Sequence, residues 1–175
     1  MTTESFSTYD VAKLIGVSRS TVQQIVDRGV YVASIEEAEG KGTRNQFSRE
    51  DVYRIAVILE LNKLNIPQKK ASEIVKNIDW SFPTKKKILY ADDEAPAFLT
   101  KKEVDYKKPT TALFILKSSM MGKKAAFILA EQVAPGENIS GKVGVSGSGN
   151  IILMDLGFGF KQQYDAAIEN LKAQK

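Results

Sequence analysis

The sequence predicts an α+β protein in which a helix-rich N-terminal part precedes a strand-rich part that ends in a helix. Three observations predict this. Serines at positions 7, 18 and 48 precede segments with helical apolar spacing, where they can act as N-caps. Apolar and β-branched runs, typical of strands, follow between residues 88 and 156. Helical spacing then returns in residues 160–173.

The first two predicted helices form a closely joined pair. Ser7 caps the first helix, and Asp10, three residues later, completes a weak capping box. Gly16 and Val17 make the turn, Ser18 caps the second helix, and Gly29 ends it. The spacing turns six side chains inward: Val11, Ala12, Ile15, Val22, Ile25 and Val26. This is a helix-turn-helix arrangement, whose second helix normally enters the DNA major groove.

The residues after this pair predict a hairpin and two more helices. Residues 30–35 and 44–47 resemble two strands around a turn-rich tip. Ser48 caps a third helix that is apolar on two sides, so it must be covered twice. Pro67 begins a fourth helix.

A boundary is predicted near Trp80, where Pro83 prevents a helix from continuing. We therefore expect a DNA-binding domain at residues 1–79 and a small α+β domain at residues 80–175. The second domain is expected to hold a mainly antiparallel sheet and the C-terminal helix. Its predicted strands are 88–90, 111–118, 125–133 and 150–156.

The charge is distributed unevenly along the chain. Residues 1–79 hold 6 Lys and 5 Arg against 11 acids, whereas residues 80–175 hold 14 Lys against 10 acids. Yet all five arginines, which suit phosphates and guanine edges, lie in the neutral part. This favours a DNA-binding surface there. The chain has no His and no Cys, which removes the usual residues for nucleophilic catalysis, for metal ligation and for disulfides.

The second helix and the hairpin offer the groups that DNA binding requires. Arg19 suits guanine O6 and N7, while Gln23 or Gln24 suits adenine. Hydroxyls at the start of the helix can hold a phosphate, and basic hairpin residues can reach a neighbouring one. The predicted DNA-binding residues are Ser18, Arg19, Ser20, Thr21, Gln23, Gln24, Arg28, Lys41, Thr43, Arg44 and Asn45. For Arg28, Arg49 and Arg54 the alternative is surface pairing with Asp27, Glu50 or Asp51, which we favour for Arg54.

With TYDVAKLIGVSRSTVQQIVDRGV followed by TRNQFSREDVYRIAVILELNKLNI, the chain resembles the MerR-type winged-helix regulators and the related excisionase-like domains. The resemblance covers residues 6–78. It implies DNA contacts by Ser20, Thr21 and Gln24, and phosphate contacts by Arg44 and Asn45 on the wing. Two features differ: Gln24 and Ile25 replace the family's paired tyrosines, and the long coiled-coil helix that usually follows the domain is missing.

We therefore expect a bacterial or phage transcriptional regulator that binds double-stranded DNA, recognising a palindromic site as a homodimer. The second domain is expected to dimerise the protein, to sense a small-molecule effector, or both. The third helix and the face of residues 164–171 are the candidate dimer surfaces. We expect no enzymatic activity, no cofactor and no metal. No signal peptide or membrane span is expected, hence a cytoplasmic location with the nucleoid.

Two alternatives remain open. One is an excisionase-like protein that bends DNA during recombination. The other is a metal-dependent enzyme in the C-terminal domain, built on lysines and on four acidic residues, Asp92, Asp93, Glu94 and Asp105. The segment GENISGKV at 136–143 approaches a phosphate-binding loop, but Val143 replaces the hydroxyl that would hold magnesium.

Overall fold

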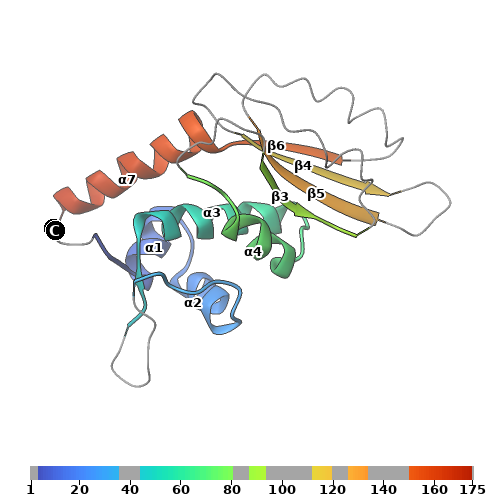
Figure 1. Cartoon of the computed structure of the whole chain (residues 1–175). Helices are drawn as coiled ribbons and strands as arrows, with labels where there is room; N and C mark the ends of the chain where they lie inside the picture. The colour runs from blue at the N-terminus through green and yellow to red at the C-terminus, as the bar shows by residue number, and fades with distance from the viewer. Residues whose placement is uncertain are drawn as a thin grey trace. The chain divides into compact units, whose positions relative to one another are not determined.

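The computed structural model describes residues 4–35, 44–80, 87–93, 112–119, 126–133 and 150–174. Its contacts divide the chain into two compact units. Unit 1 comprises residues 1–76 and 161–175, and unit 2 comprises residues 77–160. The predicted α+β class is confirmed, because helices dominate unit 1 and antiparallel strands dominate unit 2 (Figure 1).

The helix pair forms as the capping pattern predicts. Helix α1 spans Thr8–Ile15 and α2 spans Arg19–Asp27. The Ser7 hydroxyl accepts from the Asp10 amide at 3.2 Å, and the Asp10 carboxylate accepts from the Ser7 amide at 3.1 Å. Gly16 ends α1 with φ +76°, a left-handed conformation that glycine adopts without strain. The chain thereby turns within three residues, and α2 packs on α1.

The hairpin prediction is wrong in its pairing. Strand β2, Gln46–Phe47, pairs antiparallel with β1, Phe6–Ser7, and not with residues 30–35. Residues 30–35 form no strand and make one backbone hydrogen bond to β2, from the Ile35 amide to the Gln46 carbonyl at 3.2 Å. The reason is burial: Phe6 and Phe47, which face each other in the register, are both buried. The predicted hairpin tip at 36–43 lies outside the described residues.

Helices α3, Arg49–Lys63, and α4, Gln68–Lys76, complete the N-terminal part of unit 1. Ser48 and Asp51 form a second capping box at the start of α3. Both predicted apolar sides of α3 are covered within the chain, since Val52, Val57 and Leu61 are fully buried. Within unit 1, α3 packs against α1 and α4.

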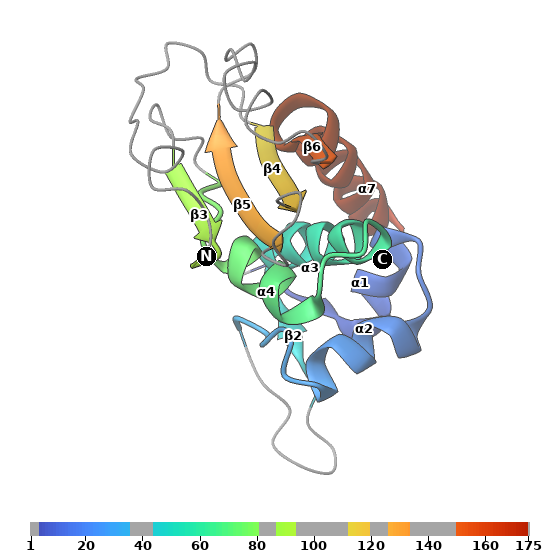
Figure 2. The ribbon, with the colours of Figure 1, turned by 90° about the vertical axis from the view of Figure 1, so that its right-hand side faces the viewer.

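Unit 2 contains one antiparallel sheet with the strand order β3-β5-β4-β6 (Figure 2). The strands are β3, Lys87–Ala91, β4, Ala112–Ser119, β5, Ala126–Val133, and β6, Asn150–Asp155. Each of the four strands predicted from the sequence forms. Consecutive residues of β5 from Ile128 to Gln132 are buried, so this strand is covered on both faces.

The C-terminal helix α7, Gln162–Ala173, follows a π-helical turn at Leu156–Lys161. The sequence places this helix with the second domain, whereas the structure groups it with unit 1, where it packs on α1. Its apolar face, formed by Tyr164, Ile168 and Leu171, is buried.

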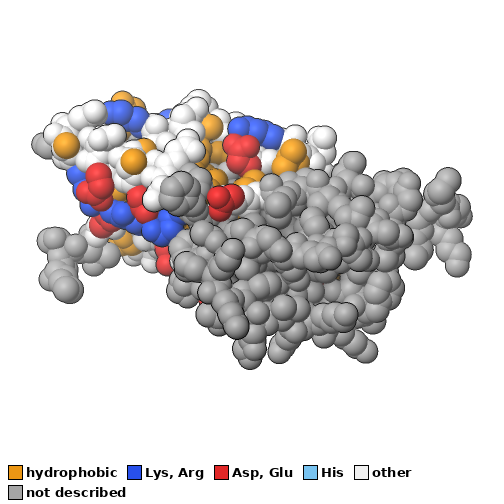
Figure 3. Space-filling view, turned by 90° about the horizontal axis from the view of Figure 1, so that it is seen from above, with side chains coloured by type: hydrophobic (Ala, Val, Ile, Leu, Met, Phe, Trp, Pro, Cys, Tyr) orange, Lys and Arg blue, Asp and Glu red, His pale blue; other side chains and the backbone are white. Residues whose placement is uncertain are grey.

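This burial corrects the prediction of the dimer surfaces. Apart from Leu64, which is 40% exposed at the end of α3, the apolar sides of α3 and α7 are largely covered within one chain, so little of either face is left for a second copy. On the face of the molecule seen in Figure 3, described side chains of both charges are interspersed and hydrophobic ones are scattered. None of the described helices has the length and the apolar character needed to cross a membrane.

Candidate nucleic-acid interface

Helix α2 separates its residues into a buried and an outward face. Val22 and Ile25 are buried, one helical turn apart, and pack into the fold. Three of the predicted DNA-binding side chains are exposed on the opposite side: Arg19, Ser20 and Gln24. Gln23 and Thr21 are half-buried. The helix therefore presents a polar surface that begins at its first residue.

Three hydroxyls cluster at the N-terminus of α2. The Ser18 hydroxyl accepts from the Thr21 amide at 3.1 Å, which makes Ser18 the N-cap. It also lies 2.7 Å from the Ser20 hydroxyl and 2.8 Å from that of Thr21. Ser18 thus has a structural role in starting the helix. The three hydroxyls share two contacts, so at least one O–H remains to donate to a phosphate oxygen or to water at the helix start.

Gln23 is oriented by a neighbour on its own helix. Its Nε2 donates to Asp27 Oδ1 at 2.7 Å, one turn further along. The amide keeps a second N–H and its Oε1, which are the two groups that pair with adenine N7 and N6. Asp27 therefore fixes the Gln23 side chain without using up its capacity to recognise a base.

Two predicted residues of α2 and two of the wing come together in one polar hollow of about 260 Å³. We call it the α1–α2 hollow. Its lining residues are Ser7, Thr8, Tyr9, Arg19, Gln23, Arg44 and Asn45. Arg44 is exposed, whereas Asn45 is only 7% exposed and has little surface left for a phosphate. Lys41 and Thr43 lie outside the described residues.

Three of these lining residues, at the start of α1, are not among those predicted from the sequence: Ser7, Thr8 and Tyr9. Tyr9 is 64% exposed. One signal was present in the sequence, because the helical spacing that turns Val11 and Ala12 inward places Tyr9 on the outer face. A large aromatic side chain on the polar face of a predicted helix is a candidate contact residue.

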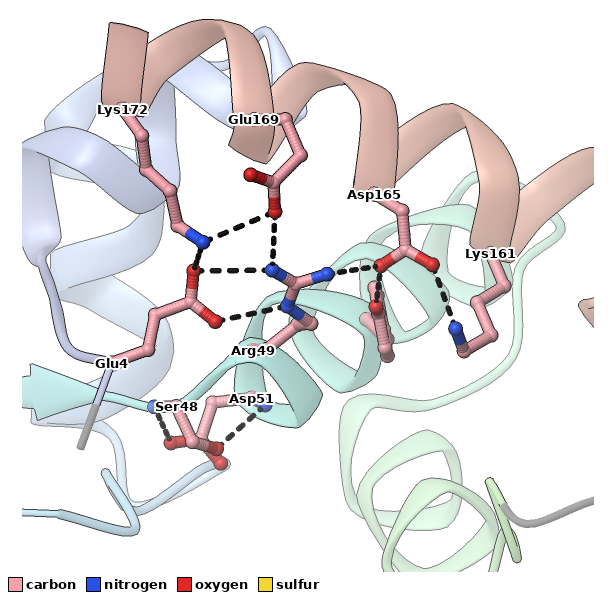
Figure 4. Close-up of polar contacts among 9 residues, drawn as sticks. Glu4, Ser48, Arg49, Asp51, Lys161, Asp165, Glu169 and Lys172 are labelled. Carbon is pink, nitrogen blue, oxygen red and sulfur yellow. Dashed lines mark hydrogen bonds and ion pairs between the residues drawn. The ribbon is translucent and has the colours of Figure 1, made fainter. Parts of the chain in front are cut away.

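The five arginines divide into two groups. Arg54 pairs with Glu50 at 2.8 Å, as favoured from the sequence. Arg49 also pairs within the protein, but with more distant partners than expected: Glu4, Asp165 and Glu169 (Figure 4). Arg19, Arg28 and Arg44 are exposed and make no ion pair with any residue that the structure describes. The arginines without carboxylate partners are thus the three predicted to bind DNA.

Arg28 lies at the opposite end of α2 from Arg19. It is the C-cap residue and lines a second hollow with Lys69 and Lys76 of α4. Nine helical residues separate the two ends, which corresponds to about 13 Å. The major groove is about 12 Å wide.

A buried carboxylate fixes the base of the wing. Asp51 is fully buried and accepts hydrogen bonds from the Tyr31 hydroxyl at 2.7 Å and the Ser34 amide at 3.0 Å. It also accepts from the Ser34 hydroxyl at 2.6 Å and the Ser48 amide at 2.8 Å. Burial, together with the Asp51 carboxylate, raises the pKa of Tyr31, so its hydroxyl remains a donor. Asp51 therefore links Tyr31 and Ser34, which precede the wing, to the start of α3, which follows the wing.

Of the acidic residues considered for metal binding, Asp92 has a structural role. Asp92 accepts from the Tyr90 hydroxyl at 2.6 Å and from the Ile128 amide at 2.7 Å, which ties β3 to β5. Asp93 is exposed. Glu94, Asp105 and the segment at 136–143 lie outside the described residues. Within the described ranges, no cluster of acidic residues is suited to hold a metal ion.

The tight turn at Gly16, the buried face of α2 and its outward polar surface define a helix-turn-helix domain. Residues 6–78 match the model of the family described as MerR HTH family regulatory protein. This part of the chain is thus a MerR-type helix-turn-helix domain, which confirms the resemblance. The match supports a DNA-binding transcriptional regulator. No curated protein matches the chain at a significant level.

Proposed function

We propose that the protein is a sequence-specific transcriptional regulator whose α2 helix reads bases in the major groove. The observation that carries the proposal is the α1–α2 hollow, where Arg19, Gln23 and Arg44 meet beside the outward face of α2. Arg19 and Gln23 are the base-reading residues, with Ser20 and Gln24 next to them on the exposed surface. Arg28 and Arg44, with Lys41 and Thr43 of the wing, contact phosphates.

Two copies bind together in this proposal. A single module of this size buries about 600–1,000 Å² on DNA and reads few base pairs, which gives weak discrimination. A homodimer on a palindromic site doubles the contacts and matches the symmetry of the duplex. Since the apolar faces of α3 and α7 are covered within the chain, the dimer contact must use other surfaces.

Unit 2 has the regulatory role in this proposal, either by dimerising the protein or by sensing an effector. Its two chain connections support this, because residue 77 follows α4 and residue 160 precedes α7. Helix α7 packs on α1, the first helix of the DNA-binding pair. A change in unit 2 would therefore reach the helix-turn-helix through α7. The proposed role requires the protein to be in the compartment that holds the DNA. It includes no catalytic reaction.

The test is selection of bound sequences from a random duplex library with the full-length protein. The expected result is an enriched palindrome whose half-sites lie about 34 Å, or one helical turn, apart. Light scattering should then give two chains per duplex. Absence of any enriched sequence contradicts sequence-specific binding. An enriched single half-site bound by one chain contradicts the homodimer but not base reading.

A further inference from the structure

Tyr9 is an exposed aromatic residue among polar and basic neighbours. Among the described residues it is the most exposed of the large hydrophobic side chains, ahead of Val32 at 50%. Its neighbours in the α1–α2 hollow are nevertheless polar or basic. An exposed aromatic ring with a hydroxyl, surrounded by donors, is suited to a partner that has both an apolar and an anionic part.

The described lining of the hollow carries positive charge. None of the described residues that line it is acidic, and its two arginines, Arg19 and Arg44, make no ion pair with a described residue. Asp10 is the acidic residue of α1. It is 8% exposed and accepts from the Ser7 amide and hydroxyl at 3.1 and 2.9 Å. The Asp10 carboxylate is therefore engaged in the capping box of α1.

The hollow has room for a small anionic group. Its volume of about 260 Å³ is far above the roughly 10–15 Å³ that one water molecule requires. Sites that enclose a small-molecule ligand usually exceed about 300 Å³ and are mainly apolar. A phosphate with its first hydration shell fits such a space, and guanidinium groups bind phosphate through paired N–H donors.

We propose that the α1–α2 hollow binds one phosphodiester of the DNA backbone, next to the bases that α2 reads. The Tyr9 hydroxyl donates to a phosphate oxygen and its ring packs against the adjoining deoxyribose, while Arg44 pairs with the anion and Arg19 extends from the hollow to the neighbouring base. This inference rests on the proposed function and adds Tyr9 to it as a positioning residue. A backbone contact at the start of α1 fixes the register of α2 in the groove but carries no sequence information itself.

The test measures duplex binding by the full-length Tyr9→Phe and Tyr9→Ala variants, on the selected site and on random DNA. Tyr9→Phe is expected to weaken binding about tenfold or more on both duplexes, because it removes one hydrogen bond to a charged group. Tyr9→Ala should weaken both further, since it also removes the ring. Leu64→Ala, at a residue that is 40% exposed at the end of α3, is the control and should bind as the wild type does. Thermal unfolding checks that each variant is folded.

A second arm replaces single phosphates of the selected duplex by neutral methylphosphonates. When the replaced phosphate is the one that Tyr9 contacts, which is one position per half-site, the wild type and Tyr9→Phe should bind the duplex with equal affinity. Wild-type affinity in both Tyr9 variants overturns the inference and leaves the proposed function intact. A loss confined to the selected site also overturns it, because that result indicates base reading by Tyr9. If the wild type binds no duplex at all, the proposed function fails, and this inference fails with it.

Discussion

Arg49 on α3 donates from Nη1 to Asp165 Oδ1 on α7 at 3.0 Å, a contact between residues 116 positions apart (Figure 4). The same guanidinium binds both oxygens of Glu4 at 3.0 and 3.2 Å and Glu169 at 2.7 Å. Lys172 bridges Glu4 and Glu169, and Lys161 pairs with Asp165. We call these residues the Arg49 cluster. It joins the N-terminal segment, α3 and α7, all within unit 1.

Arg49→Ala should lower the free energy of unfolding by about 1–2 kcal/mol, since exposed ion pairs contribute at most about 1 kcal/mol each. The substitution leaves three carboxylates with only two lysines, so α7 should separate from α3 more readily. Urea unfolding measures the stability, and proteolysis between unit 2 and α7 measures the release. Lys63→Ala is the control, because it removes an exposed pair with Glu60 and should cost under about 0.5 kcal/mol. Equal effects of the two substitutions would contradict the role given to Arg49.

The Arg49 cluster also predicts an acid-sensitive stability. Burial acts to raise the pKa of Glu4 and of Asp165, but their cationic partners outweigh it and lower both below the usual 4.5 and 3.8. Arg49 lowers the pKa of Glu169 as well. Because the folded state binds these protons less readily, the stabilisation is complete above the usual values and is lost as the pH falls through the lowered ones.

Unfolding free energies measured from pH 6 to pH 3 should therefore fall more steeply for the wild type than for Arg49→Ala. The variant has already lost the cation that favours the ionised carboxylates. Parallel pH profiles would contradict this origin of the acid sensitivity.

The local elements could be predicted from the sequence, whereas the long-range pairings could not. Ser7, Ser18 and Ser48 cap α1, α2 and α3 because a cap depends on residues three positions apart. The partners of Arg49 lie 45 to 120 positions away, and no spacing rule connects them. The same holds for α7, whose apolar face predicts burial but not the elements that cover it.

For the candidate site too, local features could be predicted from the sequence, whereas long-range contacts could not. The outward face of α2 follows from helical periodicity, which identifies Arg19, Ser20 and Gln24. The hollow that brings Tyr9 beside Arg44 depends on the pairing of β1 with β2, through which the end of the wing returns to the start of α1. A two-residue strand carries too little pattern to reveal its partner, so Phe6 and Phe47 could not be matched from the sequence.

Tyr31→Phe and Asp51→Ala should act on the same contact. Asp51→Ala leaves several buried donors without an acceptor and should cost about 3 kcal/mol of stability, whereas Tyr31→Phe should cost about 1–2 kcal/mol. Because Tyr31 donates directly to Asp51, the double variant should be little less stable than Asp51→Ala alone. Urea unfolding of the four proteins gives the coupling energy. Simple additivity would show that the two residues contribute independently.

Gly16→Ala should destabilise the protein through the backbone alone. Gly16 has φ +76°, which costs an L-residue about 1–2 kcal/mol. A Cβ at this position would meet nothing within 4 Å, so no steric contribution adds to that cost. Gly16→Asn should cost less, since asparagine tolerates the left-handed region. An increase in stability on Gly16→Ala, as expected when the only effect is a stiffer unfolded chain, would contradict the turn geometry.

Arg19→Ala and Arg44→Ala should weaken DNA binding in different ways, although both line the same hollow. Arg19 is the first residue of α2 and reaches base edges in the proposed complex, so its loss should cost about 1–3 kcal/mol on the selected site and less on random DNA. Arg44 binds phosphate only. Its loss should weaken both duplexes equally and reduce the slope of log K against log salt by about 0.9. Titrations at several salt concentrations separate the two effects, with Lys63→Ala as the exposed cation outside the interface. If both arginine variants lose the same affinity on both duplexes, Arg19 acts as a phosphate contact, and base reading then depends on Gln23 and Gln24.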